Sequence, residues 1–141
     1  MFIEKSDLTT VATDETVALL TAENDDIINQ IIAENVALAK SYLDAFFDTE
    51  TIFNATGEDR SQLLIKVIKD LVIYHIYIRH TRHHENEVAL KRYEEAMNWL
   101  EMVAKGKINP NLPAKIDEET GEETHIAVFT TEPEGRINSD F

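Results

Sequence analysis

The sequence predicts an all-α protein of about four helices, with a buried central helix and a C-terminal extended or hairpin tail. Two segments, residues 26–47 and 87–105, carry apolar side chains three to four positions apart, which is the spacing of a helix with one buried face. Between them, residues 60–83 contain a run that is apolar in nearly every helical direction. A helix of that kind is buried all round, so we expect it at the centre of the fold.

Two short helix-like pieces precede the first long helix. They lie at residues 6–11 and 15–20, with Ser6 and Asp14 as candidate N-caps. Neither piece is long enough to be stable alone, so we expect both to pack against the longer helices.

The long helix at residues 26–47 can be capped by either Asn24 or Asp25, and a stretch without periodicity follows it. Residues 48–59 contain Gly, Asn, Thr and acidic side chains, which are typical of a loop. Asp59 is the candidate cap of the next helix.

The apolar run at residues 63–78 also suits a strand, because it contains many β-branched side chains. Lys66, Lys69 and Asp70 favour the helix, since spacings of three and four place them on one polar edge. His75 lies inside this run, where we expect a core histidine that is hydrogen-bonded to a backbone carbonyl.

The helix at residues 87–105 has clear boundaries in the sequence. Asn86 is a candidate N-cap, and Gly106 is a natural terminator. Pro110 and Pro113 then prevent the helix from continuing. We therefore expect the helical part of the chain to end at this point.

The chain divides into a helical domain at residues 1–113 and an acidic C-terminal tail at residues 114–141. In the tail, Thr120 and Gly121 separate two short strand-like runs, which is a hairpin signal. The tail has too few large apolar side chains to offset the entropy that it would lose on ordering. We expect it to stay mobile until a partner orders it.

The formal net charge is −14, and it is unevenly distributed. Residues 1–59 carry a net −11, residues 60–116 a net +4, and residues 117–141 a net −7. Nucleic acids and anionic bilayers are bound through excess Lys and Arg, so we expect no sequence-specific nucleic acid binding and no membrane binding. The layout allows an acidic segment of one copy to meet a basic segment of another, although a solvated acidic surface would give the same pattern.

A metal site would need histidines and carboxylates alone, because the chain has no cysteine. His80 and His84 have the one-turn spacing of helical metal ligands, and Glu87 or His125 could supply a third. The H-E-x-x-H pattern is incomplete, however, since Val88 stands where its second histidine would be. Basic side chains at the end of a helix also interact favourably with the helix dipole. We therefore predict no catalytic residue, no metal and no cofactor, and hence no enzyme.

Residues 89–113, ALKRYEEAMNWLEMVAKGKINPNLP, resemble the C-terminal helix and stop of the family named for gene product 36 of Mu-like phages. The matching positions are Arg92, Tyr93, Ala96, Trp99, Leu100, Gly106, Leu112 and Pro113. Residues 63–77 are similar to the family's central helix. The start of the chain is also similar, around Phe2 and Asp7, as is its end at residues 136–141.

The resemblance implies a non-enzymatic component of a tailed phage particle or of a prophage. Related adaptor proteins form a ring under the portal and join the packaged head to the tail. The resemblance therefore implies a homo-oligomeric ring that contacts portal and tail-joining proteins. It also implies that the protein is in the bacterial host cytoplasm during assembly and in the virion afterwards. Residues 48–59 and 80–84 depart from the family pattern, so the histidine cluster lies outside the resemblance.

The candidate subunit or portal contacts are charged and aromatic side chains of the basic segment and the tail. They are Arg79, Arg82, Lys105, Lys107, Phe129 and Phe141. Two other functions are open on the residues alone. One is a metal-dependent hydrolase that uses His80 and His84, and the other is a regulatory module that binds a partner through its acidic tail.

Overall fold

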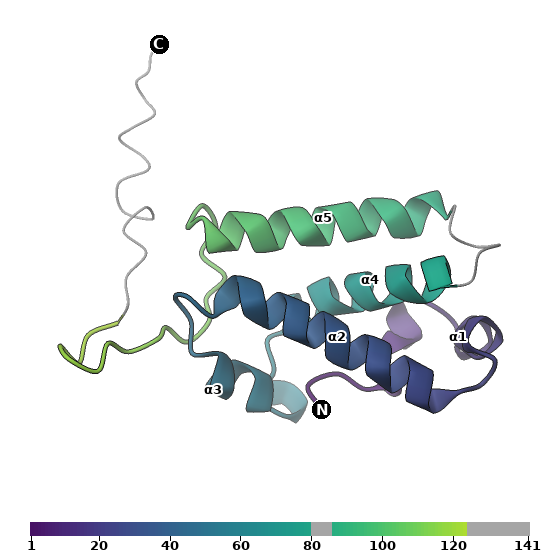
Figure 1. Cartoon of the computed structure of the whole chain (residues 1–141), viewed down its shortest axis with the longest axis horizontal. Helices are drawn as coiled ribbons and strands as arrows, with labels where there is room; N and C mark the ends of the chain where they lie inside the picture. The colour runs from purple at the N-terminus through teal and green to yellow at the C-terminus, as the bar shows by residue number, and fades with distance from the viewer. Residues whose placement is uncertain (80–85, 124–141) are drawn as a thin grey trace, which may run out of the picture.

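The computed structural model describes residues 1–79 and 86–123, which form a bundle of α-helices with two short 3-10 helices (Figure 1). In chain order the elements are η1 (Lys5–Thr10), α1 (Asp14–Thr21), α2 (Asp25–Leu43), α3 (Thr49–Asn54), η2 (Gly57–Asp59), α4 (Gln62–Arg79) and α5 (Glu87–Ala104). Within the described part of the chain, β pairing is limited to two isolated bridges. The predicted all-α class is confirmed.

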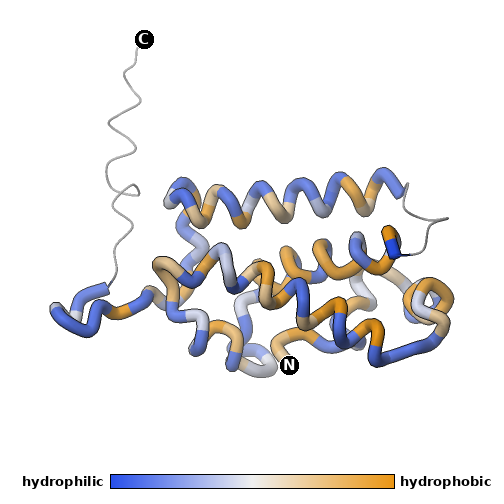
Figure 2. Tube along the Cα trace, viewed as in Figure 1, coloured by the Kyte–Doolittle hydropathy of each residue, from blue (hydrophilic) through white to orange (hydrophobic). Residues whose placement is uncertain are grey.

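Helix α4 is the buried central element that the sequence predicts. It packs against α5, α2, α1 and η1. Its buried residues are Leu64, Ile65, Val67, Ile68, Asp70, Leu71, Val72, Ile73 and Ile76. Figure 2 shows hydrophobic stretches along α4 that are broken by a few hydrophilic positions, whereas hydrophobic and hydrophilic residues alternate along α5. The difference follows from position, because α5 has one face in solvent, whereas α4 exposes only its ends and a narrow edge at Lys66.

The polar edge of α4 explains why this apolar run is a helix. Lys66 Nζ donates to Asp70 Oδ2 across one helical turn, over 3.1 Å. Lys69 Nζ donates to Thr10 Oγ1 over 2.7 Å, which ties η1 to the side of α4. The first bond is the i,i+4 pair of a helix, and a strand would place Lys69 on the face opposite Lys66 and Asp70, so these three side chains share one edge only in a helix.

Helices α2 and α5 cover α4 with single apolar stripes. The buried hydrophobic residues are Ile28, Ile31, Ile32, Ala39 and Leu43 on α2, and Ala89, Ala96, Leu100 and Val103 on α5. The two predicted asparagine caps are confirmed: Asn24 Oδ1 accepts the Asp26 N–H over 3.0 Å, and Asn86 Oδ1 accepts the Ala89 N–H over 2.9 Å. The sequence therefore located the starts of both helices.

Gly106 ends α5 as predicted. Its φ of +76° lies in the left-handed region, which glycine adopts without steric cost. Its N–H donates to the Val103 carbonyl over 3.0 Å, and the Lys107 N–H donates to the Met102 carbonyl over 2.8 Å. This pair of bonds is a Schellman motif, which satisfies the last free carbonyls of the helix.

Two predicted caps near the N-terminus are wrong. Ser6 lies inside η1, where the Glu4 N–H donates instead to Asp7 Oδ2 over 2.8 Å. Asp14 is the first residue of α1, and the cap is Thr13, whose hydroxyl accepts the Thr16 N–H over 3.1 Å. Both pieces therefore begin one residue earlier than the sequence pattern indicated.

The predicted loop at residues 48–59 is also wrong, because it contains α3 and η2. Asp48 caps α3 by accepting the Thr51 N–H over 3.2 Å, and Ile52 is buried against the core. Asp59 does not cap α4. That cap is Ser61, whose hydroxyl accepts the Leu64 N–H over 3.2 Å.

The segment after α5 returns to the end of α2, which stops at Leu43 rather than at the predicted residue 47. Phe47 and Ala114 form an antiparallel bridge, in which the Asp48 N–H donates to the Pro113 carbonyl over 2.9 Å. The chain then leaves the bundle at this end (Figure 1). Within residues 1–79 and 86–123, no helix is both long and apolar enough to cross a membrane.

Candidate functional site

The predicted contact residues lie at opposite ends of the bundle. Arg79 is the last residue of α4, whereas Lys105 and Lys107 follow the end of α5, and both helices have 18 residues and run in opposite directions (Figure 1). At 1.5 Å per residue the two groups are separated by roughly 27 Å. The structure therefore does not bring them together as one basic surface. Arg82, Phe129 and Phe141 lie outside the described residues.

His75 forms the backbone hydrogen bond that the sequence predicts, but it is half-buried and not in the core. Its Nδ1 lies 2.7 Å from the Leu71 carbonyl, and because a carbonyl only accepts, the ring donates this hydrogen bond. The ring also contacts Tyr74 and Tyr93 edge to face, with centroids 5.5 and 5.6 Å away. These contacts fix the imidazole at the side of α4.

The other predicted ligand pair falls outside what the structure describes. His80 and His84 lie in residues 80–85, which the structure does not describe, so their predicted pairing stays a prediction. Among residues 1–79 and 86–123, no group of three or more His, Asp or Glu side chains is placed to hold a metal ion.

A groove of about 550 Å³ opens between the first half of α2 and the end of α4. Its apolar lining comes from Ile27, Ile31 and Ile78, and its polar lining from Gln30, Glu34, His75 and Arg79. This α2/α4 groove lies at the end of the bundle where α5 begins. Two further apolar side chains are exposed there, Val88 and Leu90.

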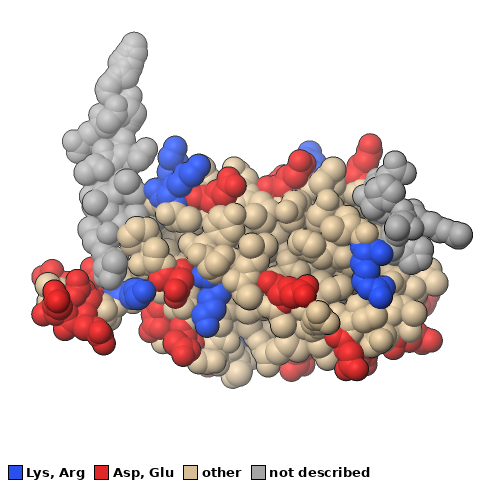
Figure 3. All heavy atoms as spheres, viewed as in Figure 1, with Lys and Arg blue, Asp and Glu red and all other residues tan. Residues whose placement is uncertain are grey.

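The opposite end of the bundle carries a projecting acidic arm, which we define as residues 116–123. It contains five carboxylates, from Asp117, Glu118, Glu119, Glu122 and Glu123, and all of its residues are exposed. Figure 3 shows these acidic side chains gathered on a projection at the left edge of the molecule. None of the five forms an ion pair within the described residues.

The arm is a closed turn. Ile116 and Glu123 form an antiparallel bridge, the Asp117 N–H donates to the Glu122 carbonyl over 2.7 Å, and the Gly121 N–H donates to the Asp117 carbonyl over 2.8 Å. The turn predicted at Thr120 and Gly121 is therefore present, closed by one isolated bridge, whereas the second strand-like run of the predicted hairpin lies outside the described residues. Residues 124–141 lie outside the described residues.

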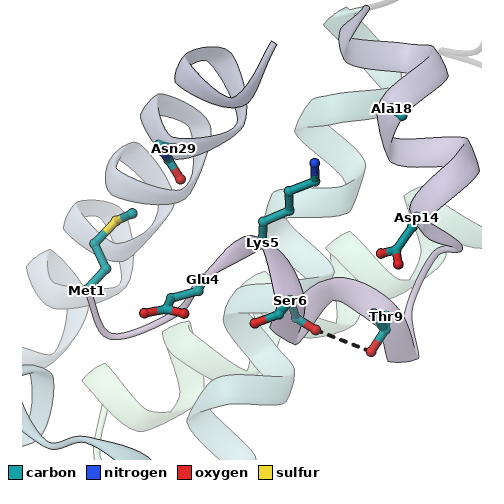
Figure 4. A pocket seen from close by; sticks show the side chains of 8 residues that line it. All are labelled: Met1, Glu4, Lys5, Ser6, Thr9, Asp14, Ala18 and Asn29. Atoms are coloured by element: carbon teal, nitrogen blue, oxygen red, sulfur yellow. Dashed lines mark hydrogen bonds between the residues drawn. The ribbon is translucent and has the colours of Figure 1, made fainter. Parts of the chain in front are cut away.

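A cavity of about 720 Å³ lies between η1, α1 and α2, and the sequence analysis did not find it. Figure 4 shows Lys5 standing between Asp14 of α1 and Asn29 of α2, with Glu4 at the opposite edge. Lys5 Nζ is already paired with Asp25 Oδ1 over 2.9 Å, and this hydrogen bond raises the pKa of Lys5. The charged side chains that line the cavity are Glu4, Lys5 and Asp14, and the partner of Lys5, Asp25, lies outside the lining.

The comparisons with known proteins identify the family but not a relative of known role. A comparison with curated proteins and one with solved structures each gave no match. The family model described as "Bacteriophage Mu, Gp36" matches residues 2–128, which include every helix and the whole acidic arm. The match does not reach residues 136–141, whose similarity to the family tail stays a prediction. The chain belongs to the Bacteriophage Mu Gp36 family of phage proteins.

Proposed function

We propose that the chain is a head–tail adaptor of a tailed phage or prophage, which forms a ring between the portal and the tail. The observation that carries the proposal is the family match over residues 2–128. It covers nearly the whole chain, so the role is proposed for the bundle and its arm together.

The unlike ends of the bundle support a ring of identical subunits. A ring repeats one heterologous contact, so each subunit needs two different and complementary faces. One end carries the acidic arm. The other carries the α2/α4 groove, where Arg79 and Ile78 are exposed in the lining, and the exposed Val88 in the first turn of α5.

The adaptor acts by binding and not by chemistry. Its partners are further copies of the chain, the portal and the tail-joining proteins, and it works in the host cytoplasm during assembly and then in the virion. The acidic charge of the chain suits a ring around a DNA channel, because acidic walls do not retain DNA as it passes.

Deletion of the gene from an inducible phage or prophage tests this role. We expect electron microscopy of the lysate to show DNA-filled heads and separate tails, because packaging precedes joining in an adaptor's pathway. Purified full-length protein added to that lysate should restore joined particles. Joined particles in the deletion strain, or a block before heads fill with DNA, would contradict the proposal.

Metal analysis of protein purified without a His-tag separates the adaptor from the alternative hydrolase. The adaptor is expected to contain no stoichiometric metal. Stoichiometric zinc or manganese that is lost in a His80→Ala/His84→Ala double variant would favour the hydrolase instead.

A further inference from the structure

We propose that the acidic arm of one copy docks in the α2/α4 groove of the next copy, and that this is the contact repeated around the ring. The inference deepens the proposed function and rests on it, because it names the two surfaces through which copies of the chain would meet. Both surfaces consist of described residues.

The groove has the composition of a docking surface. Ile31 is almost fully buried at its base, whereas Ile78 at its edge keeps 37% of its surface exposed. Arg79 lines the same groove, is exposed, and forms no ion pair within residues 1–79 and 86–123. An apolar groove with a charged edge recognises a segment that carries both an apolar side chain and the opposite charge.

The arm supplies that chemistry. Ile116 at its base is 54% exposed, and the five carboxylates follow within seven residues. Because the turn is already closed by backbone hydrogen bonds, docking it would cost less conformational entropy than docking a free chain.

The charges of the groove also orient the arm. Glu34 lies on the α2 side, where its Oε2 accepts a hydrogen bond from Gln30 Nε2 over 3.2 Å. Arg79 lies on the α4 side. Repulsion from Glu34 and attraction to Arg79 both direct the carboxylates toward α4, which leaves Ile116 facing the isoleucines of the groove.

The position of the arm makes this contact intermolecular. The bridge between Phe47 and Ala114 anchors the arm at the end of α2, whereas the groove is formed by the first half of the same helix. The base of the groove at Ile31 lies 12 residues before the end of α2 and therefore roughly 18 Å from it, whereas an eight-residue turn folded back on itself reaches only about 13 Å. A copy therefore cannot place its own arm in its own groove, so the contact joins copies head to tail.

Disulfide trapping tests the contact cleanly, because the natural chain contains no cysteine. The full-length chain with Glu119→Cys and Ile78→Cys should form a ladder of dimers, trimers and larger species on mild oxidation, in assembled particles and in concentrated protein. A mixture of the two single variants should stop at the dimer, since each then offers only one reactive end. Adding Arg79→Glu to the double variant should lower the cross-linked yield by about tenfold.

The matched control is Glu119→Cys with Lys91→Cys, since Lys91 is exposed on α5 and does not line the groove. It should give no ladder. The inference is overturned if the Ile78 pair gives no more cross-linking than this control, or gives only an intramolecular bond. Such a result would leave the adaptor role intact, because that role is decided by the particles of the deletion strain.

Discussion

At the scale of single residues, the pair of Asp7 and Arg60 holds the N-terminus to the turn before α4. Arg60 Nη1 donates to Asp7 Oδ2 over 3.1 Å and to the Phe2 carbonyl over 2.8 Å. Burial of the Asp7 carboxyl acts to raise its pKa, but the hydrogen bonds from Arg60 and from the Glu4 N–H outweigh burial and hold the pKa below its ordinary 3.8.

Replacing Asp7 with Asn should therefore destabilise the protein in a pH-dependent way. The folded-state pKa is lower than the unfolded one, so the charge contributes its full stabilisation above the unfolded value and loses it as the pH falls through the folded value. We expect a loss of about 1–3 kcal/mol in the free energy of unfolding at neutral pH. The difference from wild type should shrink below about pH 4.

Urea denaturation of both proteins at pH 7, 4 and 2.5 measures this difference. Glu94→Gln is a suitable control, because Glu94 is exposed on α5 and forms no ion pair among the described residues. A difference between wild type and Asp7→Asn that does not change with pH would show that the charge of Asp7 is not the cause.

Ala22 is strained where α1 turns into α2. Its φ of +54° lies in the left-handed region, and the side chain is exposed, so nothing compensates within the core. A left-handed non-glycine residue costs roughly 1–2 kcal/mol, and glycine's extra chain entropy offsets about half of that. Ala22→Gly should therefore stabilise the protein by about 0.5–1 kcal/mol in urea denaturation.

The control is Ala33→Gly, at an exposed position inside α2, which should destabilise the protein by a similar amount. A change of the same sign for both variants would contradict this account.

The residue-scale prediction from sequence succeeded at Asn86, which was the one cap candidate for its helix. For the first long helix the sequence left Asn24 and Asp25 open, and the structure selects Asn24. Asp59 and Ser61 are both good cap residues, and the choice between them depends on tertiary contacts. Arg60, which lies between them, turns away to bind a carboxylate 53 positions earlier, and sequence spacing contains no signal of that pairing.

At the scale of elements, α4 determines the stability of the bundle because it contacts four other elements. Leu71 is fully buried on this helix, whereas Leu63 keeps 47% of its surface exposed. Leu71→Ala should lower the free energy of unfolding by about 2–5 kcal/mol, since it leaves a cavity, whereas Leu63→Ala should cost less than about 1 kcal/mol. Equal losses in chemical denaturation would show that α4 is not central.

The three long helices were predictable because each repeats its apolar spacing over several turns. Helix α3 was not, because its six residues complete less than two turns and give no measurable period. Ile52 is buried, and the neighbouring Phe53 contacts Phe2 edge to face, so α3 packs against the N-terminal segment of the chain. Short elements of this kind are defined by tertiary packing and not by local pattern.

At the scale of the whole molecule, the asymmetry of the two ends could not be read from the sequence. The charge of each segment predicted that unlike surfaces exist, but it did not show that Arg79 and Lys105 of the basic segment lie at opposite ends of the bundle. Their separation follows from the antiparallel packing of α4 on α5. The α2/α4 groove likewise exists only because Ile27 and Ile78, which are 51 positions apart, face each other across two helices.

Deleting residues 117–141 should leave the bundle intact. The described residues removed, 117–123, are all exposed, and the bridge between Phe47 and Ala114 is retained. We expect the helical circular dichroism and the melting temperature to stay nearly unchanged. Self-association of the truncated chain should be weaker than that of the intact chain. Because the contact is partly ionic, self-association of the intact chain should also fall as the salt concentration rises from about 0.05 to 0.5 M. A truncated chain that does not fold would show that the tail belongs to the core.

The position of the chain in a particle tests the adaptor role most directly. Cryo-electron microscopy of particles from the phage or induced prophage that encodes it should show a ring of helical bundles between the portal and the tail. In that ring, density for α2, α4 and α5 should be recognisable, with the acidic end of each bundle against the groove end of its neighbour. A neck without this chain, or the chain located elsewhere in the particle, would contradict the role proposed here.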